Sequence, residues 1–311
     1  MRIMLTSKLL ATAQNELDFS FIETPRLSEY TTFRIGGPAA FAVFPNTISA
    51  FAELIKLLKA YNEPYCVLGN GSNILFADSG FKGTVIITSR MNRISSDGFR
   101  ITAECGASLI KLACFAGKHS LSGLEFAYGI PGSVGGAVYM NAGAYGGEIS
   151  EVLESCLCFD TANLTETKFD RDECDFGYRS SLFIKNPGRY ILLQATFALS
   201  SGNADEIKAA MNDYMSRRRE KQPLEYPSAG SVFKRAPGYF TAKLIDDAGL
   251  KGKRIGGAQI SEKHAGFIVN VGNATAKDVM ALIALTKETV HEKFNVDIEC
   301  EIRFLGDSEK Q

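Results

Sequence analysis

The sequence of 311 residues has no tryptophan and only three histidines. His119, His264 and His291 lie far apart and match no metal-ligand spacing, so we expect no metal site. No apolar run approaches the roughly 18 residues that a membrane-spanning helix needs, so we expect no membrane span. The first twenty residues are interrupted by charged side chains and lack the apolar core of a signal peptide.

Signals for disulfide bonds are also missing. Seven cysteines are an odd number for pairing, and no C-x-x-C motif occurs. Cys156 and Cys158 are two residues apart in a strand-like run, so their side chains are expected on one face. We therefore predict buried or half-buried free thiols, as in proteins of a reducing cytoplasm.

The sequence has no excess of either charge. Lys and Arg number 34, Asp and Glu number 35, and the net charge is −1. Without a basic field we expect no nucleic-acid partner, and any anionic ligand must be held by local groups. Length alone predicts two or three domains.

Glycine, in contrast, is concentrated in two stretches. Gly123–Glu148 reads GLEFAYGIPGSVGGAVYMNAGAYGGE, with eight glycines and no charge from Ala127 to Gly147. A shorter loop, Leu68–Leu75, reads LGNGSNIL and follows a strand-like run. Glycine tolerates positive φ and close approach, and successive N–H groups in such loops can bind an anion.

The two glycine loops favour a ligand with a diphosphate and a flat ring. Neither loop matches G-x-x-x-x-G-K-[ST] or G-x-G-x-x-G, so neither a P-loop nor a Rossmann fingerprint is supported. The alternatives are a Gly/Ala-rich turn between strands and, for the shorter loop, an Asn-Gly hairpin turn.

Periodicity predicts regular elements around these loops. A first helix is expected within residues 1–26, and Thr31–Pro45 is interpreted as a short strand, a turn at Gly36–Pro38 and a second strand. Helical spacing predicts further helices over Ile48–Tyr61, Ser108–Ala116, Asp205–Arg219, Phe240–Ala248 and Thr275–Phe294. Other strands are expected at Tyr65–Leu68, Thr84–Thr88, Phe99–Glu104, Leu153–Phe159, Leu164–Asp170 and Tyr190–Ala198.

The last predicted strand, Val296–Phe304, alternates between apolar and polar residues. Its apolar face is expected to run from Val296 to Phe304 through Ile298, Cys300 and Ile302. Glu301 is then on the opposite face, where it is available to a cleft.

Further motifs occur along the chain. They are TTFRIGGPA at Thr31–Ala39, YRSSLF at Tyr178–Phe183, SAGSVFK at Ser228–Lys234, LKGKRIGGAQISEKHAGFIVN at Leu250–Asn270 and ECEIRFLG at Glu299–Gly306. Together with the glycine loops, and in the same order, these motifs resemble those of the UDP-N-acetylenolpyruvoylglucosamine reductases. These flavin enzymes of peptidoglycan precursor synthesis are usually called MurB. The resemblance extends from about Leu27 to Gly306 and is closest to the shorter, type II branch, which lacks an inserted tyrosine-bearing loop over the substrate.

The resemblance implies an α+β fold class. It combines an FAD-binding fold of the vanillyl-alcohol-oxidase (PCMH) type, in two α/β subdomains, with a C-terminal substrate-binding α+β domain. Subdomain 1 is expected at residues 1–88, completed by 296–311, and subdomain 2 at 89–220. The substrate-binding domain is expected at residues 221–295.

The resemblance also implies the cofactors. We expect non-covalent FAD, because neither glycine loop offers a His or Cys to tether the flavin, and NADPH as co-substrate. The cofactor-binding residues implied are Arg34, Gly69, Asn70, Gly71, Ser72, Asn73, Gly129, Ile130, Pro131, Gly132, Ser133, Gly135, Gly136, Asn141, Ala142 and Gly143. Of these, Arg34 is equally well interpreted as a surface arginine.

The implied reaction reduces the enolpyruvyl ether of UDP-N-acetylglucosamine to a lactyl ether, giving UDP-N-acetylmuramate. Ser231 is expected to donate a proton to C2 of the substrate, and the guanidinium of Arg179 to bind the substrate carboxylate. Glu301 is expected to hydrogen-bond to that carboxylate or to a relay water. Tyr178 and Lys234 are expected substrate contacts, the latter near a phosphate.

Other interpretations of the catalytic candidates remain open. Ser231 is also typical of a turn or cap residue after Gly230, and Arg179 of a salt bridge with Asp172 or Asp175. Most strand glutamates are simply solvated. The family usually has proline where this chain has Cys300, which puts the exact placement of the neighbouring Glu301 in doubt.

The expected partners are UDP-N-acetylenolpyruvoylglucosamine and NADPH. We expect the protein itself to be a cytoplasmic monomer. One rival function is an FAD-dependent carbohydrate or alcohol oxidase of the same fold, which shares the cofactor loops but not the catalytic set. A second rival is a flavin- or nucleotide-binding regulatory module, which binds its ligand without turnover.

Overall fold

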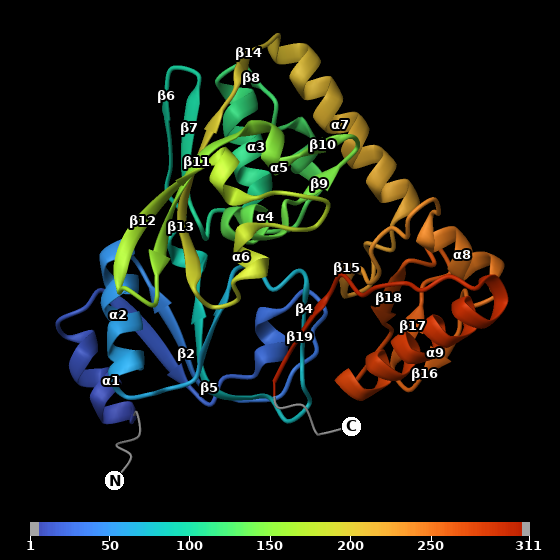
Figure 1. Cartoon of the computed structure of the whole chain (residues 1–311), viewed down its shortest axis with the longest axis horizontal. Coiled ribbons are helices and arrows are strands. Elements are labelled where there is room, and N and C mark those ends of the chain that lie inside the picture. Colours follow the sequence, from blue (N-terminus) through green and yellow to red (C-terminus); the bar gives the residue numbers. More distant parts are fainter. Residues whose placement is uncertain (1–5, 307–311) are drawn as a thin grey trace. The chain divides into compact units, whose positions relative to one another are not determined.

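The computed structural model describes residues 6–306 (Figure 1). The chain forms two compact units. Unit 1 comprises Met1–Glu23, Phe41–Asn70 and Gly83–Arg217, and unit 2 comprises Thr24–Ala40, Gly71–Lys82 and Arg218–Gln311. The division into three domains stays a prediction, and its ends at residues 1–5 and 307–311 lie outside the described residues.

The first sheet of unit 1 has the strand order β1-β2-β5-β3. Its strands are β1 (Phe19–Glu23), β2 (Ala39–Pro45), β5 (Phe81–Ile87) and β3 (Tyr65–Leu68). β1 is antiparallel to β2, and β3 is parallel to β5. The helices of this region are α1 (Ser7–Gln14) and α2 (Ile48–Ala60). The helix predicted at Ile48–Tyr61 is confirmed as α2, and its apolar residues Phe51, Leu54, Ile55 and Leu58 are fully buried.

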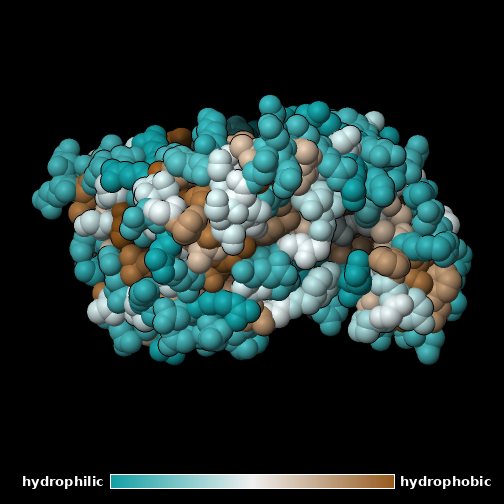
Figure 2. Space-filling model, turned by 90° about the horizontal axis from the view of Figure 1, so that it is seen from above, coloured by the Kyte–Doolittle hydropathy of each residue, from teal (hydrophilic) through white to brown (hydrophobic). Residues whose placement is uncertain are grey.

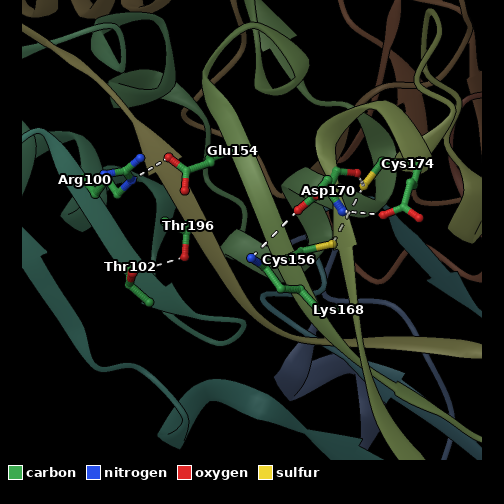
Figure 3. Close-up of polar contacts among 9 residues, drawn as sticks. Arg100, Thr102, Glu154, Cys156, Lys168, Asp170, Cys174 and Thr196 are labelled. Atoms are coloured by element: carbon green, nitrogen blue, oxygen red, sulfur yellow. Dashed lines mark hydrogen bonds and ion pairs between the residues drawn. The ribbon is translucent and has the colours of Figure 1, made fainter.

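The second sheet of unit 1 is antiparallel, with the order β12-β11-β13-β7-β6. Its strands are β12 (Thr165–Asp170), β11 (Leu153–Asp160), β13 (Tyr190–Ala198), β7 (Arg100–Glu104) and β6 (Ile94–Asp97). The hydroxyls of Thr102 and Thr196, on the neighbouring strands β7 and β13, lie 3.1 Å apart (Figure 3). Arg100 Nε on β7 donates to Glu154 Oε2 on β11, across β13, at 2.6 Å (Figure 3).

Cysteines pack this sheet against the segment that follows β12. Cys156 Sγ on β11 lies 3.8 Å from Cys158 Sγ. It also lies 3.8 Å from Cys174 Sγ (Figure 3). Cys174 ends the 3₁₀ turn η4 (Arg171–Cys174). All seven thiols are free and are buried or half-buried, as predicted. Burial raises the pKa of Cys66 and Cys105 to about 12, so both stay protonated at neutral pH.

The remaining elements of unit 1 cover or connect these sheets. The helices are α3 (Leu109–Lys118), α4 (Val134–Met140), α5 (Ile149–Val152), α6 (Leu182–Lys185) and α7 (Ala204–Lys221), which ends in unit 2. The short strand pairs are β9 (Gly143–Ala144) with β10 (Gly147–Glu148), and β8 (Leu121–Ser122) with β14 (Ser200–Ser201). The 3₁₀ turns are η2 (Thr88–Arg90) and η3 (Glu125–Gly129).

Unit 2 is built on an antiparallel sheet with the order β15-β18-β17-β16. Its strands are β15 (Ser228–Ser231), β18 (Phe267–Asn270), β17 (Ala258–Ile260) and β16 (Arg254–Ile255). The helices α8 (Thr241–Asp247) and α9 (Ala276–Phe294) contribute Leu244, Ile245, Val279 and Leu282 to one buried apolar cluster. The unit also contains the 3₁₀ turn η1 (Leu27–Tyr30) and the parallel pair β4 (Ile74–Phe76) and β19 (Arg303–Leu305).

The short strand predicted at the start of Thr31–Pro45 is wrong. The chain there is irregular, although Phe33 and Ile35 are buried. Thr32 N–H donates to the Gly71 carbonyl at 3.2 Å, and its carbonyl accepts from Ser228 N–H at 3.1 Å. Its backbone groups thus bond to two distant segments, and Arg34, at φ 56°, turns the chain out of an extended path.

The predicted strand Val296–Phe304 is wrong over most of its length. The described strand is only Arg303–Leu305, which pairs with β4. Alternating burial persists as far as Ile302, but Phe304 is 40% exposed instead of sharing the apolar face. The alternation arose because one side of this segment is buried within unit 2, although, among the described residues, no partner strand runs along it. An alternating sequence alone does not distinguish such a segment from a strand in a sheet.

The surface is mainly hydrophilic on the face shown in Figure 2, with apolar side chains gathered in smaller patches. Among residues 6–306, no helix is long and apolar enough to span a bilayer.

We predict that the N-terminus of α9 stabilises the fold through Asp278. Asp278 Oδ2 accepts from Thr275 N–H at 3.0 Å and from Gly257 N–H at 3.2 Å. These backbone hydrogen bonds, the Thr275 bond first, lower the pKa of Asp278 below its ordinary 3.8. Asp278→Ala should reduce the free energy of unfolding at pH 7 by about 1 kcal/mol, as loss of a cap typically does.

Urea unfolding at several pH values measures this effect. Because the folded-state pKa is depressed, the difference between wild type and variant is present above pH 3.8 and is lost as pH falls through the folded-state pKa. Glu288→Ala, at an exposed position on the same helix, is the control and should change little. An equal loss in both variants, or a loss that persists in acid, contradicts the role of Asp278.

Candidate functional site

The two glycine loops meet within unit 1. A Cβ added at Gly69 would lie 2.0 Å from Ser133 Oγ, which is far closer than side-chain atoms approach. Beside it, Asn70 Nδ2 donates to the Pro131 carbonyl at 3.2 Å. The absence of a side chain at Gly69 is therefore what lets the end of β3 lie directly against the second loop.

The first loop has backbone donors to offer a ligand. The N–H groups of Gly69, Asn70, Gly71, Ser72 and Asn73 make no hydrogen bond to another described residue. Gly71, at φ 60°, packs on the preceding unit 2 segment, where an added Cβ would lie 2.2 Å from the Tyr30 carbonyl oxygen. Successive unbonded N–H groups in a tight turn fit a phosphate group.

The second glycine stretch is not one continuous loop, as the sequence had indicated. It contains η3 and the helix α4, which Ser133 caps by accepting from Gly136 N–H at 3.2 Å. The N–H groups of Ile130 and Val134 donate to the Ala127 and Ala107 carbonyls. These two amides are therefore used within the fold, and any contact of Ile130 or Val134 with a ligand depends on other atoms.

Gly135 and Asn141 also have roles inside unit 1. A Cβ at Gly135 would lie 2.9 Å from Cys105 Cβ, so this glycine permits close packing of α4. Asn141 is fully buried and ends α4 at φ 44°. Its amide donates to Glu148 Oε1 at 3.0 Å and to the Gly177 carbonyl at 3.1 Å, and its Oδ1 accepts from Ser150 N–H at 2.9 Å. The Asn141 side chain thus fixes the turn that follows α4.

Arg179 lies against that turn. Its guanidinium donates to the carbonyls of Gly143 at 3.0 Å and Asn141 at 3.4 Å, and lies 5.2 Å from the ring centre of Tyr178. The carboxylates considered as its partners pair elsewhere, Asp172 with Arg171 and Asp175 with Lys185. Unit 1 therefore brings Arg179 and Tyr178 to the second glycine stretch, and Tyr178 is 54% exposed.

Ser231 and Glu301 come together in unit 2. Ser231 ends β15, and the Glu301 N–H donates to the carbonyl of the next residue, Val232, at 2.8 Å. Lys234 N–H donates to the Glu299 carbonyl at 2.9 Å, so two backbone bonds flank the bridge between Phe233 and Cys300. Both Ser231 and Glu301 are half-buried, and Ser231 Oγ donates to the Phe233 carbonyl at 3.2 Å.

Cys300 does not disturb this pairing. The backbone bonds around it belong to Glu301 and Glu299, so the N–H of Cys300 is not needed for the bridge. Proline also lacks an N–H group, but it fixes φ at about −65° as well. With Cys300 at this position, Glu301 N–H is bonded to the Val232 carbonyl next to β15.

Lys234 and Arg34 are less clearly placed for a ligand. Lys234 Nζ pairs with Glu299 Oε2 at 3.0 Å. Arg34 is exposed, so the choice between ligand contact and surface residue stays open. The role of Thr32 was not predicted from the sequence. Its Oγ1 donates to the Ser228 carbonyl at 2.7 Å, and no local pattern indicates a partner 196 residues away.

Comparison with known proteins identifies the family. Residues 222–305 match the family model of the UDP-N-acetylenolpyruvoylglucosamine reductase C-terminal domain, and residues 39–163 match that of an FAD-binding domain. The chain is 51% identical over 281 residues to UDP-N-acetylenolpyruvoylglucosamine reductase of Clostridium novyi, covering 90% of this chain and 91% of the relative. The chain belongs to the MurB family.

Other relatives agree with this assignment. The MurB protein of Lactiplantibacillus plantarum is 50% identical over 284 residues, with 90% of this chain and 92% of the relative covered. The crystal structure of Thermus caldophilus MurB superposes with a TM-score of 0.77 at 35% identity, covering 92% of this chain and 98% of that one. The predicted fold class, α+β with an FAD-binding fold, is confirmed.

We predict that Gly69→Ala weakens FAD binding, because the added methyl group must displace Ser133 and with it the cap of α4. Gly117→Ala is the matched control, since its Cβ would meet only ordinary contacts at 3.4 Å inside α3. Titration of each apoprotein with FAD should give a dissociation constant raised at least about tenfold for Gly69→Ala, a loss of roughly 1.4 kcal/mol, and unchanged for the control. Equal affinities in the two variants contradict this role of Gly69.

Proposed function

We propose that the protein is a UDP-N-acetylmuramate dehydrogenase, which uses NADPH and FAD to reduce UDP-N-acetylenolpyruvoylglucosamine to UDP-N-acetylmuramate. The observation that carries this proposal is 51% identity, over 90% of the chain, to a reductase named for that substrate. The FAD-binding domain match over residues 39–163 supplies the cofactor.

The first glycine loop is the proposed holder of the FAD diphosphate. Its unbonded N–H groups from Gly69 to Asn73 supply donors without a positive charge, which suits a molecule with a net charge of −1. The proposed contacts from the second stretch are Gly129, Ile130, Pro131, Gly132, Ser133, Gly135, Gly136, Asn141, Ala142 and Gly143. FAD, when bound, supplies the hydride chemistry that connects NADPH to C3 of the enolpyruvyl group.

Addition of a hydride at C3 leaves negative charge shared between C2 and the carboxylate, so the protein must stabilise that charge and deliver a proton. Arg179 is the proposed partner of the carboxylate, because its planar guanidinium can pair with both carboxylate oxygens. Its bonds to the Asn141 and Gly143 carbonyls hold the guanidinium in a fixed orientation. Tyr178 and Lys234 are proposed further substrate contacts.

Ser231 is the proposed proton donor to C2. A serine hydroxyl is a weak acid, but carbanion character at C2 makes a sufficiently strong base. In the structure the Ser231 hydroxyl donates to a backbone carbonyl two residues on, which keeps its hydrogen directed until a substrate competes for it. Glu301, whose backbone is bonded beside Ser231, is proposed to hydrogen-bond to the substrate carboxylate or to a relay water.

The reaction uses NADPH and a nucleotide sugar, so we place the enzyme in the cytoplasm and propose that it acts as a monomer of the shorter, type II branch. An anaerobic experiment tests the function. NADPH should bleach the flavin absorption of the purified protein, and UDP-N-acetylenolpyruvoylglucosamine should restore it. If only oxygen restores the colour, the protein is an oxidase and the proposal fails.

Ser231→Ala should separate the two half-reactions. Flavin reduction by NADPH should keep its rate, while reoxidation by the enolpyruvyl substrate should slow by about 10²–10⁴, as loss of a proton donor typically does. Ser231→Cys should be less affected because a thiol still donates a proton. Stopped-flow absorbance measures both steps, and an equal fall in both for the Ala variant contradicts a proton-donating role.

A further inference from the structure

The second half of the first glycine loop is attached to the strand that carries Ser231. The Gly71 carbonyl accepts from Thr32 N–H at 3.2 Å, and Thr32 Oγ1 lies 3.5 Å from the same oxygen. Thr32 in turn exchanges two hydrogen bonds with Ser228, at 2.7 Å through its hydroxyl and at 3.1 Å through its carbonyl. One residue thus connects Gly71 to the start of β15.

The same loop is attached at its other end to the Glu301 segment. Asn73 Nδ2 donates to the Glu301 carbonyl at 3.1 Å, and the Asn73 carbonyl accepts from Arg303 N–H at 3.0 Å. The parallel pairing of β4 with β19 continues from this contact, beginning with Ile74 opposite Arg303. Asn73 therefore marks the point where the loop becomes a strand beside the C-terminal segment.

Glu301 itself is outside any strand, and two single hydrogen bonds hold its backbone. Its N–H donates to Val232 at 2.8 Å, and its carbonyl accepts from Asn73. Removing the Asn73 bond releases the Glu301 carbonyl from the loop. A carboxyl group that must meet a substrate within about 0.5 Å depends on such supporting hydrogen bonds, because they restrict the freedom of the reacting group.

We propose that Asn73 is a positioning residue for the Glu301 carboxyl. Through its side-chain amide, Asn73 bonds the Glu301 backbone to the loop proposed to hold the cofactor diphosphate. The distance between this end of the loop and the segment that carries Glu301 is thereby fixed. The Asn73 side chain is then not a phosphate ligand, and only its backbone N–H serves the cofactor. This inference rests on the proposed function.

Two variants separate this role from cofactor binding. Asn73→Leu keeps the approximate size of the side chain but has no N–H donor, and it adds no charge to the loop. Asn73→Ala also deletes the donor and provides the same test if the Leu variant does not fold. Asn92→Ala is the matched control, because Asn92 is an exposed asparagine whose amide also donates to a backbone carbonyl, that of Ser89 at 2.9 Å.

The expected result is a split between the half-reactions. FAD affinity and the rate of flavin reduction by NADPH should match wild type, while reoxidation at saturating enolpyruvyl substrate should slow by about 10–100-fold, the typical cost of a displacement near 1 Å. Amide hydrogen exchange in the apoprotein should accelerate at Glu301 in both Asn73 variants and stay unchanged in the control. The exchange experiment needs neither cofactor nor substrate.

Other outcomes overturn the proposal in distinguishable ways. A loss of FAD affinity with normal exchange at Glu301 assigns the Asn73 side chain to the phosphate instead. An equal fall in both half-reactions makes Asn73 merely structural. If wild-type protein is not reoxidised by the enolpyruvyl substrate, the proposed function fails, while hydrogen exchange still tests the contact between Asn73 and Glu301.

Discussion

The close approach of Gly69 to Ser133 is the constraint on which the candidate cofactor site depends. At this position a side chain of any size would collide with the Ser133 hydroxyl. The same hydroxyl caps α4, and the turn after α4 presents the Asn141 and Gly143 carbonyls that hold Arg179. A contact between two glycine-containing loops is thereby linked, through one short helix, to the proposed carboxylate-binding residue.

The continuation of the first loop has a comparable effect in unit 2. Gly71 and Asn73 are bonded, through Thr32 and directly, to the segments that carry Ser231 and Glu301. These contacts consist of one or two hydrogen bonds each rather than the ladder of a sheet. They stabilise the fold only modestly, by about 1 kcal/mol each, but they decide where two reactive side chains lie.

The sequence predicted elements whose signal is local. The helices α2 and α9 and the strand β13 lie close to where the sequence predicted them, because their signals depend on residues within a few positions of one another. The family motifs also singled out Ser231 and Glu301, although 70 positions of sequence separate them and their segments are joined by the backbone bonds around the bridge between Phe233 and Cys300. Local patterns and a family resemblance together were sufficient for the fold class.

The predictions failed where distant segments supply the hydrogen-bond partners. The alternation of the predicted strand matches burial from Val296 to Ile302 but not at Phe304, and the described strand begins only at Arg303. The segment after Thr31 bonds to Gly71 and Ser228 instead of forming a strand. The helix α4 was also missed, since glycine-rich sequence disfavours helix, whereas here the Ser133 cap and the burial of Val134 and Val138 stabilise it.

An experimental structure of the protein with FAD bound tests the central claim most directly. We predict that the diphosphate oxygens accept hydrogen bonds from the backbone N–H groups of Gly69 to Asn73, while the Asn73 side chain remains on the Glu301 carbonyl. A diphosphate bound away from this loop, or an Asn73 amide turned onto a phosphate oxygen, would contradict the account.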